Sequence, residues 1–315
     1  MINLLQASFW FIIPLLIVAL GGMITERSGV TNIALDGIMV VGAFIGMIVL
    51  TSLEKNENLD TQVIYVIAMI ASGFTGAIFS MIHAFASIKM KADQTVSATA
   101  LNLLSPAIYT FAATTMLTGG SIIYFNRDYR MDSIPFLSDM PILGDIFFKN
   151  AFISTFIGLV LVYVIYIFMY KTKTGMRIRA IGENPQAADS LGINVYKLRY
   201  LAVGLSGFFA GIGGLVFTVT TSNSFTGNMN GYGFLAIAVV IFGNWKPFSI
   251  LGAAVLFGFL SAFGATAPTL FPTIDLPIQI YQMIPYIVTL VVLAITSKNS
   301  SAPKAIGKAY DQGER

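Results

Sequence analysis

The stretch KTKTGMRIRAIGENPQAADSLGINVYKLR, residues 171–199, is a long hydrophilic segment in a chain that is otherwise strongly apolar. It carries six Lys and Arg residues, and long apolar segments lie on both sides of it. Apolar residues make up 56% of the 315 residues and charged residues only 10%, and apolar runs near bilayer length recur along the chain. A soluble fold needs more polar surface, and a transmembrane barrel shows short alternating segments. The sequence therefore predicts an all-α polytopic membrane protein in which residues 171–199 form a cytoplasmic loop.

The remaining composition excludes several kinds of chemistry. The chain has no cysteine, which excludes a disulfide framework, a cysteine-based zinc site and thiol catalysis. The formal net charge of +3 does not indicate nucleic-acid binding, because basic residues are needed at membrane edges. The first residues, MINLLQASFWFIIPLLIVAL, lack a basic region and a small-residue cleavage site, so we predict a retained first span.

Hydropathy predicts about nine transmembrane segments. Two of them are weak: one contains Asn32 and Asp36, and another is too short to cross a bilayer unaided. The predicted segments are 7–24, 31–51, 62–83, 95–118, 151–170, 198–219, 232–243, 248–267 and 277–296.

The distribution of basic residues predicts the orientation. If residues 171–199 are cytoplasmic, then 25–30, 84–94, 244–247 and 297–315 are cytoplasmic too, and only Lys55, Arg127, Arg130 and Lys149 lie outside. We predict an outside N-terminus and a cytoplasmic C-terminus in a bacterial-type plasma membrane. The predicted outer segments also hold most of the acids: Glu54, Glu57, Asp60, Asp128, Asp132, Asp139, Asp145 and Asp275.

Two segments suggest an internal repeat within a single transmembrane domain, 1–315. Both GVTNIALDGIMVVGAFIG (29–46) and GYGFLAIAVVIFGNWKPFSILG (231–252) are glycine-punctuated, carry polar residues at membrane depth and are predicted to run in opposite directions. Broken helices in an inverted repeat are typical of transporters. The alternative is that glycine-rich apolar helices resemble one another by composition. We expect a first half to about residue 170, the loop 171–199, a second half of about 200–296 and a cytoplasmic tail, 297–315.

The outer segment 119–150 mixes charges, prolines and aromatic residues. We expect either a structured cap that receives a binding protein or a simple solvated connection.

The central loop contains signals for a short helix. Asn184 is a plausible N-cap, Pro185 suits the first helical position, and Gly192 is placed to end the helix after about two turns. We expect this helix to lie between two basic strands. It either docks in a groove of another protein or caps the adjoining spans.

Four motifs in order carry a resemblance. RAIGENPQAADSLGI (179–193) resembles the coupling-helix segment of permease subunits in ABC importers of the branched-chain amino acid, ribose and nucleoside permease superfamily. ITERSGVTNIALDGIMVVGAF (24–44) resembles the first conserved block of the nucleoside-type branch, which works with a BMP-family binding lipoprotein. ADQTVSATALNLL (92–104) and GYGFLAIAVVIFGNWKPFSILGA (231–253) are similar to two further blocks. The resemblance extends over about residues 14–296.

The resemblance implies a complex with separate partners. A second permease subunit, identical or related, completes the pathway, two cytoplasmic ATPases power it, and an outer lipoprotein delivers substrate. The chain has no phosphate loop, so ATP and Mg²⁺ belong to the ATPase and this chain is neither an enzyme nor a cofactor protein. Nucleosides are the first expectation for substrate, ribose-like sugars the second and branched-chain amino acids the third. An ion-coupled secondary transporter is the alternative from another class.

The resemblance also implies the coupling residues. Pro185, Ala187 and Ala188 are expected in the ATPase groove. The full predicted coupling set is Glu183, Asn184, Pro185, Gln186, Ala187, Ala188 and Gly192.

Polar and aromatic residues at membrane depth are the candidates for the substrate pathway. Asp36 lies one helical turn beyond Asn32, so the two share a face. Either they bind substrate hydroxyls or base edges, or Asp36 caps a broken helix or pairs with Arg27. The other candidates are Asn102, Asn223, Tyr232, Phe234 and Phe242, of which the aromatic residues are alternatively packing residues. No metal site is predicted.

Other single residues are predicted to be structural. Trp245, beside Lys246, is expected to anchor the chain at the interface. His83 lacks a nearby acid for proton relay. The glycines of segment 198–219 are expected to allow close helix packing, and Pro277 and Pro285 suggest a kinked last helix.

Overall fold

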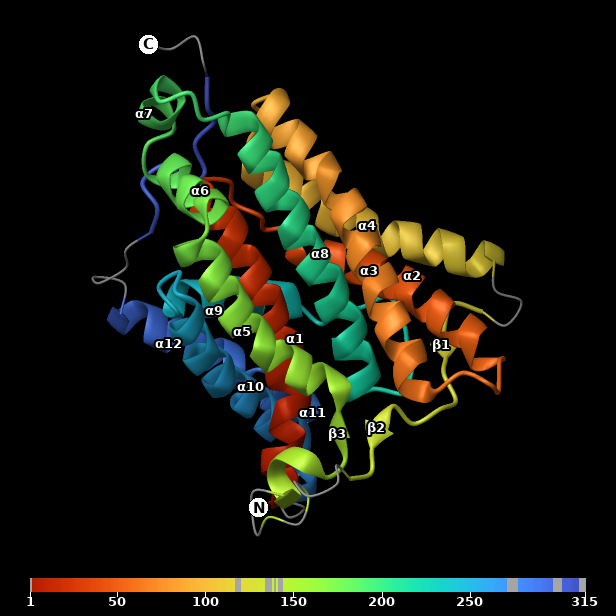
Figure 1. Ribbon diagram of the computed structural model, residues 1–315. Helices are drawn as coiled ribbons and strands as arrows, with labels where there is room; N and C mark the ends of the chain where they lie inside the picture. The colour runs from red at the N-terminus through yellow and green to blue at the C-terminus, as the bar shows by residue number, and fades with distance from the viewer. Residues whose placement is uncertain are drawn as a thin grey trace.

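The computed structural model describes residues 2–116, 120–133, 138, 140, 144–270, 277–296 and 302–311, and these form a bundle of long helices (Figure 1). Within this part of the chain, seven helices have the length and apolar composition to cross a membrane. The prediction of an all-α polytopic membrane protein is confirmed. The seven are α1 (Ile2–Arg27), α2 (Leu35–Glu54), α3 (Thr61–Ala84), α4 (Gln94–Met116), α5 (Ile153–Lys171), α8 (Val195–Thr221) and α10 (Pro247–Leu270).

The last two predicted segments are helical but shorter. Helix α9 (Tyr232–Phe242) has 11 residues, a length of about 16 Å, which is about half the hydrocarbon thickness of a bilayer. The final segment is interrupted at Met283 between α11 (Ile278–Gln282) and α12 (Ile284–Thr296), and the predicted kink stays a prediction. All nine predicted segments contain helix, but a count of nine full crossings is not confirmed.

Helices α1 and α8 form the centre of the bundle. In each of them 83% of the most apolar window is buried, against 28% in α4 and 33% in α5, which lie at the periphery (Figure 1). Helices α1, α3 and α2 all pack against α8. The centre of the protein is therefore a helix from the first half of the chain against a helix from the second.

Glycines on α8 allow this close packing. A Cβ atom at Gly211 would collide with the carbonyl oxygen of Ser72 on α3, and one at Gly214 would collide with the carbonyl oxygen of Met39 on α2. The hydroxyl of Ser72 in turn donates to the carbonyl oxygen of Gly211 at 2.5 Å. The predicted packing role of the α8 glycines is confirmed at these two positions, because backbone rather than flexible side chains occupies the space.

The end of the bundle that carries the N-terminus, which we name the cap end, contains the only short strands of the described residues. β1 (Ile123–Tyr124) pairs antiparallel with β4 (Ser224–Phe225), and β2 (Arg130–Met131) pairs with β3 (Ala151–Phe152). A single π-turn, η2 (Gly144–Phe148), completes this region. The described parts of the predicted outer segment are thus a structured cap, whereas Asp139 and Asp275 lie outside the described residues.

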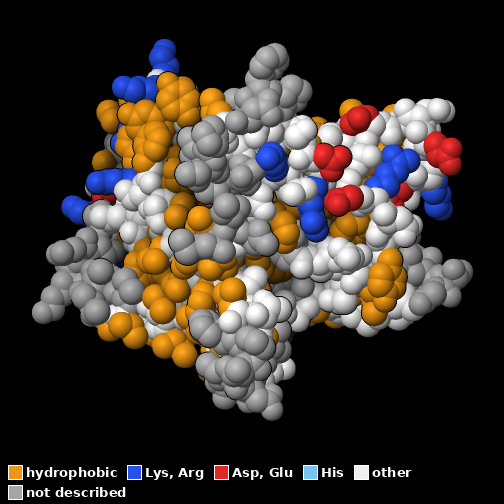
Figure 2. All heavy atoms as spheres, turned by 90° about the horizontal axis from the view of Figure 1, so that it is seen from below, with side chains coloured by type: hydrophobic (Ala, Val, Ile, Leu, Met, Phe, Trp, Pro, Cys, Tyr) orange, Lys and Arg blue, Asp and Glu red, His pale blue; other side chains and the backbone are white. Residues whose placement is uncertain are grey.

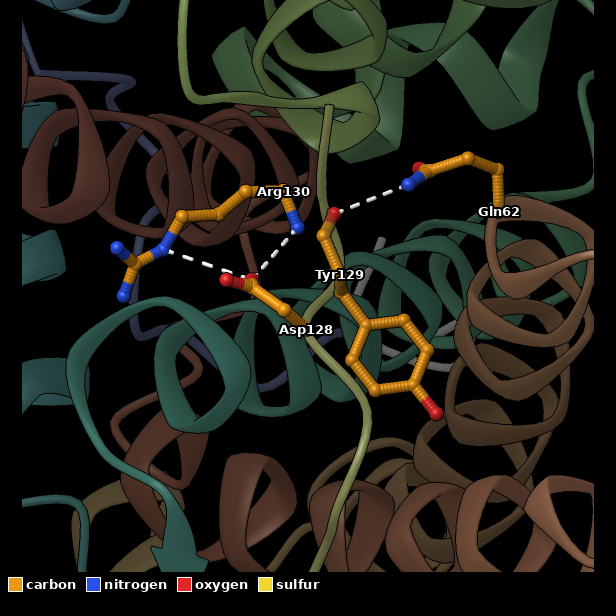
Figure 3. A network of polar contacts seen from close by, with 4 residues as sticks. All are labelled: Gln62, Asp128, Tyr129 and Arg130. Carbon is orange, nitrogen blue, oxygen red and sulfur yellow. Dashed lines mark hydrogen bonds and ion pairs between the residues drawn. The ribbon is translucent and has the colours of Figure 1, made fainter. Parts of the chain in front are cut away.

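Hydrogen bonds fix this cap to the helices below it. Gln62 of α3 donates to the carbonyl oxygen of Tyr129 at 3.1 Å (Figure 3). Within the cap itself, Asp128 accepts from the backbone N–H of Arg130 at 3.0 Å. The Tyr129 hydroxyl donates to Glu54 at 2.8 Å. Burial, and after it the hydrogen bond to Glu54, raises the pKa of the Tyr129 phenol, so the hydroxyl remains a donor.

Charges are unevenly distributed over the cap end. Figure 2 views this end, and most of the acidic side chains visible in it gather on one side together with several basic ones. The exposed charged residues in this region of the chain include Lys55, Glu57, Asp60 and Asp128. The opposite side of the same view shows hydrophobic side chains, with Lys and Arg side chains at its edge.

The opposite end of the bundle, which we name the α7 end, carries most of the basic residues. It contains the π-turn η1 (Phe85–Lys89), α6 (Lys173–Glu183), α7 (Pro185–Ser190) and residues 302–311 (Figure 1). The prediction of basic strands on both sides of the short helix is wrong, because residues 173–183 form α6 and α8 begins at Val195. Thr172 caps α6 by accepting from the backbone N–H of Gly175 at 3.1 Å.

We expect Gly211→Ala to destabilise the protein, because the added methyl meets backbone that cannot move aside. Overpacking of this kind costs about 1–3 kcal/mol. Gly252→Ala is the matched control, because Gly252 lies in α10 and an added Cβ would have nothing within 4 Å. This variant should have unchanged stability or gain up to about 1 kcal/mol. Unfolding midpoints in detergent compare the two variants, and equal midpoints would contradict the packing account.

Candidate functional site

The short helix α7 forms as the sequence predicted. The Asn184 side chain accepts from the backbone N–H of Ala187 at 3.0 Å, and Pro185 occupies the first turn. Gly192 has φ +77, a left-handed conformation that favours glycine, and its N–H donates to the carbonyl oxygen of Asp189 at 2.8 Å. Local signals at both ends therefore define this helix.

Burial divides the predicted coupling residues into two groups. Pro185 and Ala188 face the chain's own core, and Ala188 packs in a cluster with Ile181, Val195 and Tyr310. These two side chains are therefore largely enclosed by the chain itself, and their seating in a partner's groove stays a prediction. The residues that remain exposed are Glu183, Asn184, Gln186, Ala187 and Gly192, together with Leu191, which is 81% exposed.

A second candidate site is the loop of residues 28–34, which we name the α1–α2 loop, together with the start of α2. Asn102 of α4 forms hydrogen bonds with the backbone on both sides of the α2 N-terminus. Its side-chain oxygen accepts from the backbone N–H of Gly37 at 2.8 Å, and its side-chain nitrogen donates to the carbonyl oxygen of Ile33 at 2.9 Å. Asn102 thus caps the N-terminus of α2 from another helix.

Asp36 caps the N-terminus of α9. Its carboxylate accepts from the backbone N–H of Gly233 at 2.8 Å, so α2 and α9 meet N-terminus to N-terminus. Helix N-termini carry partial positive charge, which favours a carboxylate between them. The predicted capping role is confirmed, although the capped helix is α9 rather than α2. The predicted pairing with Arg27 is wrong, because Arg27 donates to the carbonyl oxygen of Trp245 at 3.0 Å.

Asn32 lies in the buried part of the α1–α2 loop. Its side-chain nitrogen donates to the hydroxyl of Ser206 at 3.1 Å, while its side-chain oxygen is buried without a hydrogen-bond partner. The neighbouring Thr31 is held by Gln94, which accepts from its N–H at 2.7 Å, and by His83, whose Nε2 lies 3.0 Å from its carbonyl oxygen. This geometry requires His83 to donate through Nε2, which is a structural role.

Two adjoining cavities open between α8, α9, α10 and α11 towards the cap end. They have volumes of about 160 and 280 Å³ and share Phe11, Phe217 and Gln282 in their walls. Tyr232 lines the smaller one, stacks on Phe217 at 4.3 Å and donates its hydroxyl to the carbonyl oxygen of Phe11 at 2.6 Å. No charged side chain occurs among the described residues that line either cavity.

The other predicted pathway residues do not share these walls. Asn223 lines a separate cavity of about 240 Å³ under the cap, beside Arg127 and Tyr129. Phe234 is 47% exposed on the surface of α9, and Phe242 packs against Phe257 with ring centres 5.1 Å apart. The structure therefore separates the predicted aromatic cluster into three environments.

Sequence reasoning missed a buried acid at the end of α1. Glu26 is 5% exposed and accepts from the indole N–H of Trp245 at 2.5 Å. Trp245 is itself 3% exposed, so its predicted role as an interfacial anchor is wrong. Sequence reasoning also missed three residues that line the cavities, because similar residues recur throughout the chain and carry no distinguishing signal. They are Phe11, Phe217 and Gln282.

Known proteins resemble this chain over nearly its full length. The guanosine ABC transporter permease protein NupQ of Bacillus subtilis is 39% identical over 99% of this chain and 97% of its own. The nucleoside ABC transporter permease protein NupC of Lactococcus lactis is 35% identical over 94% and 93%. A more distant relative, the glucose ABC transporter permease protein TsgB13 of Haloferax volcanii, is 21% identical over 95% and 78%.

A family model described as branched-chain amino acid transport system / permease component matches residues 4–293. This match covers all seven long helices, α6, α7 and the junction of α2 with α9. The superfamily inferred from four short motifs is confirmed. The chain therefore belongs to the branched-chain amino acid transport system / permease component family.

Proposed function

We propose that this chain is a permease subunit of an ATP-driven importer for nucleosides. It provides part of the pathway, and separate ATPase subunits hydrolyse ATP with Mg²⁺. A second permease subunit and an outer binding lipoprotein complete the complex. The α7 end faces the cytoplasm in this proposal, because Lys and Arg gather there.

The exposed tip of α7 carries the proposal. Gln186, Ala187 and Leu191 project from a helix whose other face is buried in the chain's own core. A short helix with small and apolar exposed residues suits a groove in a partner protein. Movement of the ATPase then reaches the bundle mechanically, through α6 into α5 and through the end of α7 into α8.

The relatives' names and the cavities near the cap end support nucleosides. Two relatives are named for guanosine or nucleoside transport. A nucleoside is neutral, with a flat base and hydroxyl groups, and the cavity walls offer aromatic faces and amide or hydroxyl groups without charged side chains. In the proposed pathway Tyr232 and Asn223 lie near the outer entrance, while Phe234 and Phe242 line neither of the two adjoining cavities.

The junction of α2 with α9 is the proposed inner part of the pathway. Asp36 and Asn102 hold the two helix starts together, and Asn32 offers a side-chain oxygen that lacks a partner. In this proposal the buried Asn32 oxygen becomes an acceptor for substrate when the junction opens, and Asp36 and Asn102 set the spacing of the two helix starts.

A sugar is the second candidate substrate, because one relative is named for glucose transport. Sugars and nucleosides share ring hydroxyls but only nucleosides carry a base. An uptake assay with labelled guanosine distinguishes them in the intact complex in vesicles. We expect unlabelled nucleosides to compete and glucose or ribose not to compete, and the reverse order would contradict the nucleoside assignment.

We expect Ala187→Arg to abolish ATP-driven uptake while folded yield stays unchanged. The new side chain places bulk and charge on the docking surface, but position 187 is exposed and so tolerates it within the chain. Ala92→Arg, at another exposed alanine of the α7 end, is the control and should transport normally. Uptake by Ala187→Arg at the native rate would remove α7 from the docking role.

We expect Asp36→Ala to destabilise the protein by about 1 kcal/mol, the usual cost of losing a helix cap. Asp36→Asn should lose less stability, because an amide oxygen can still accept from Gly233. Unfolding midpoints and uptake are measured on the same preparations. Unchanged stability in both variants would contradict the capping role, and unchanged uptake at full stability would remove Asp36 from the pathway.

A further inference from the structure

Residues 302–311, which we name the C-terminal strap, cross the α7 end of the bundle (Figure 1). The N–H of Ala305 donates to the carbonyl oxygen of Gly182 at 2.9 Å, at the end of α6. The N–H of Gly307 donates to the carbonyl oxygen of Gly29 at 3.1 Å, in the α1–α2 loop. The strap therefore connects the helix before α7 directly to the loop that leads into α2.

Side chains anchor the far end of the strap. Tyr310 is 3% exposed, packs in the cluster that contains Ala188 of α7 and contacts Tyr196 with ring centres 5.3 Å apart. Asp311 forms an ion pair with Lys91, which follows η1. The anchors thus reach α7, α8 and the turn between α3 and α4, so the strap is part of the packed structure.

Arg199 of α8 lies beneath the strap. It is 1% exposed, and its Nη1 donates to the carbonyl oxygen of Lys308 at 3.2 Å, while Nε and Nη2 have no hydrogen-bond partner. No acid of the described residues forms an ion pair with it. Its charge therefore adds to the positive potential on this side of the strap.

An open groove of about 380 Å³ separates the strap from α7. One wall is formed by residues 183–186 and the other by Lys304, Ala305, Lys308 and Ala309. Both lysines are exposed, and no acidic side chain in the described part of the chain pairs with either. Glu183 is the one carboxylate among the described residues of the groove walls, so these residues together carry an excess of positive charge.

We infer that the C-terminal strap is a second ATPase contact: its groove takes an acidic segment of the ATPase, and its anchors pass ATPase movement to the α1–α2 loop. The inference rests on the proposed function, because it needs an ATPase seated on α7. Gln186 belongs both to the exposed face of α7 and to the groove wall. A partner that contacts Gln186 on α7 therefore also lies at the edge of the groove.

A continuous series of contacts leads from the strap to the junction of α2 with α9. Gly307 forms a hydrogen bond with Gly29 at the start of the α1–α2 loop, and Asn102 forms one with Ile33 at its end. Helix α2 begins at Leu35, and Asp36 caps α9 through Gly233. Displacement of the strap thus acts on the same loop whose last residues set the start of α2.

The first experiment reverses the charge of the groove in the whole complex. Lys304→Glu/Lys308→Glu should weaken retention of the ATPase by about tenfold or more, since close charge pairs at interfaces contribute strongly. Lys89→Glu/Lys246→Glu is the matched control, with the same charge change at two exposed lysines of the α7 end that do not line the groove. Retention is measured by co-purification at increasing salt concentration.

Equal retention by the groove variant and its control would overturn the inference. So would a groove variant that keeps its ATPase but loses binding to vesicles of anionic lipid, because that result assigns the lysines to lipid headgroups. If Ala187→Arg releases the ATPase and the groove variant does not, α7 docking stands and only the strap contact fails. Absence of an ATPase from the native complex would instead remove the proposed function itself.

The second experiment tests transmission. Tyr310→Ala removes the buried anchor of the strap, whereas Tyr310→Phe keeps its ring in the cluster. We expect Tyr310→Ala to lower substrate uptake per ATP hydrolysed by about fivefold or more while ATP hydrolysis continues, because loss of a buried aromatic anchor frees the strap. Tyr310→Phe should transport as much substrate per ATP hydrolysed as the native chain. Native coupling in Tyr310→Ala would overturn the transmission role.

Discussion

The structure depends on hydrogen-bond partners for the backbone N–H groups of helices that begin inside an apolar bundle. In such surroundings an unpaired N–H group costs several kcal/mol, so every interrupted helix needs a partner for its first turn. Asn102 supplies that partner for α2, and Asp36, at the start of α2, supplies it for α9. The Asp36 cap joins the two halves of the chain, because α2 lies in the first half and α9 in the second. This contact gives the protein a polar junction inside the bundle, which is the proposed inner part of the pathway.

Close packing around α8 places that junction at the centre. Gly211 and Gly214 allow α3 and α2 to approach at backbone distance, and Ser206 on the same helix binds Asn32. Packed backbone of this kind transmits displacement because it has few alternative arrangements. Contacts at the α7 end, from α6, α7 and the C-terminal strap, can therefore influence a junction inside the bundle.

Much of the fold was predictable because its signals are local. The apolar runs indicated the helices, the Asn184, Pro185 and Gly192 signals indicated α7, and the α8 glycines indicated close packing. Contacts between residues far apart in sequence were not predictable. Trp245 meets Glu26, which is 219 residues away, and the strap meets Gly29, neither of which leaves a periodic signal. For the same reason the sequence did not reveal that Pro185 and Ala188 face inward.

The central claim is that this permease subunit works with a separate ATPase. Gentle purification of the chain from its native membrane, with mass spectrometry of the proteins that accompany it, tests the claim most directly. The account predicts an ATPase with phosphate-loop motifs, a second permease chain or a second copy of this one, and a binding lipoprotein. A chain that purifies alone and still moves solute down an ion gradient would contradict the account.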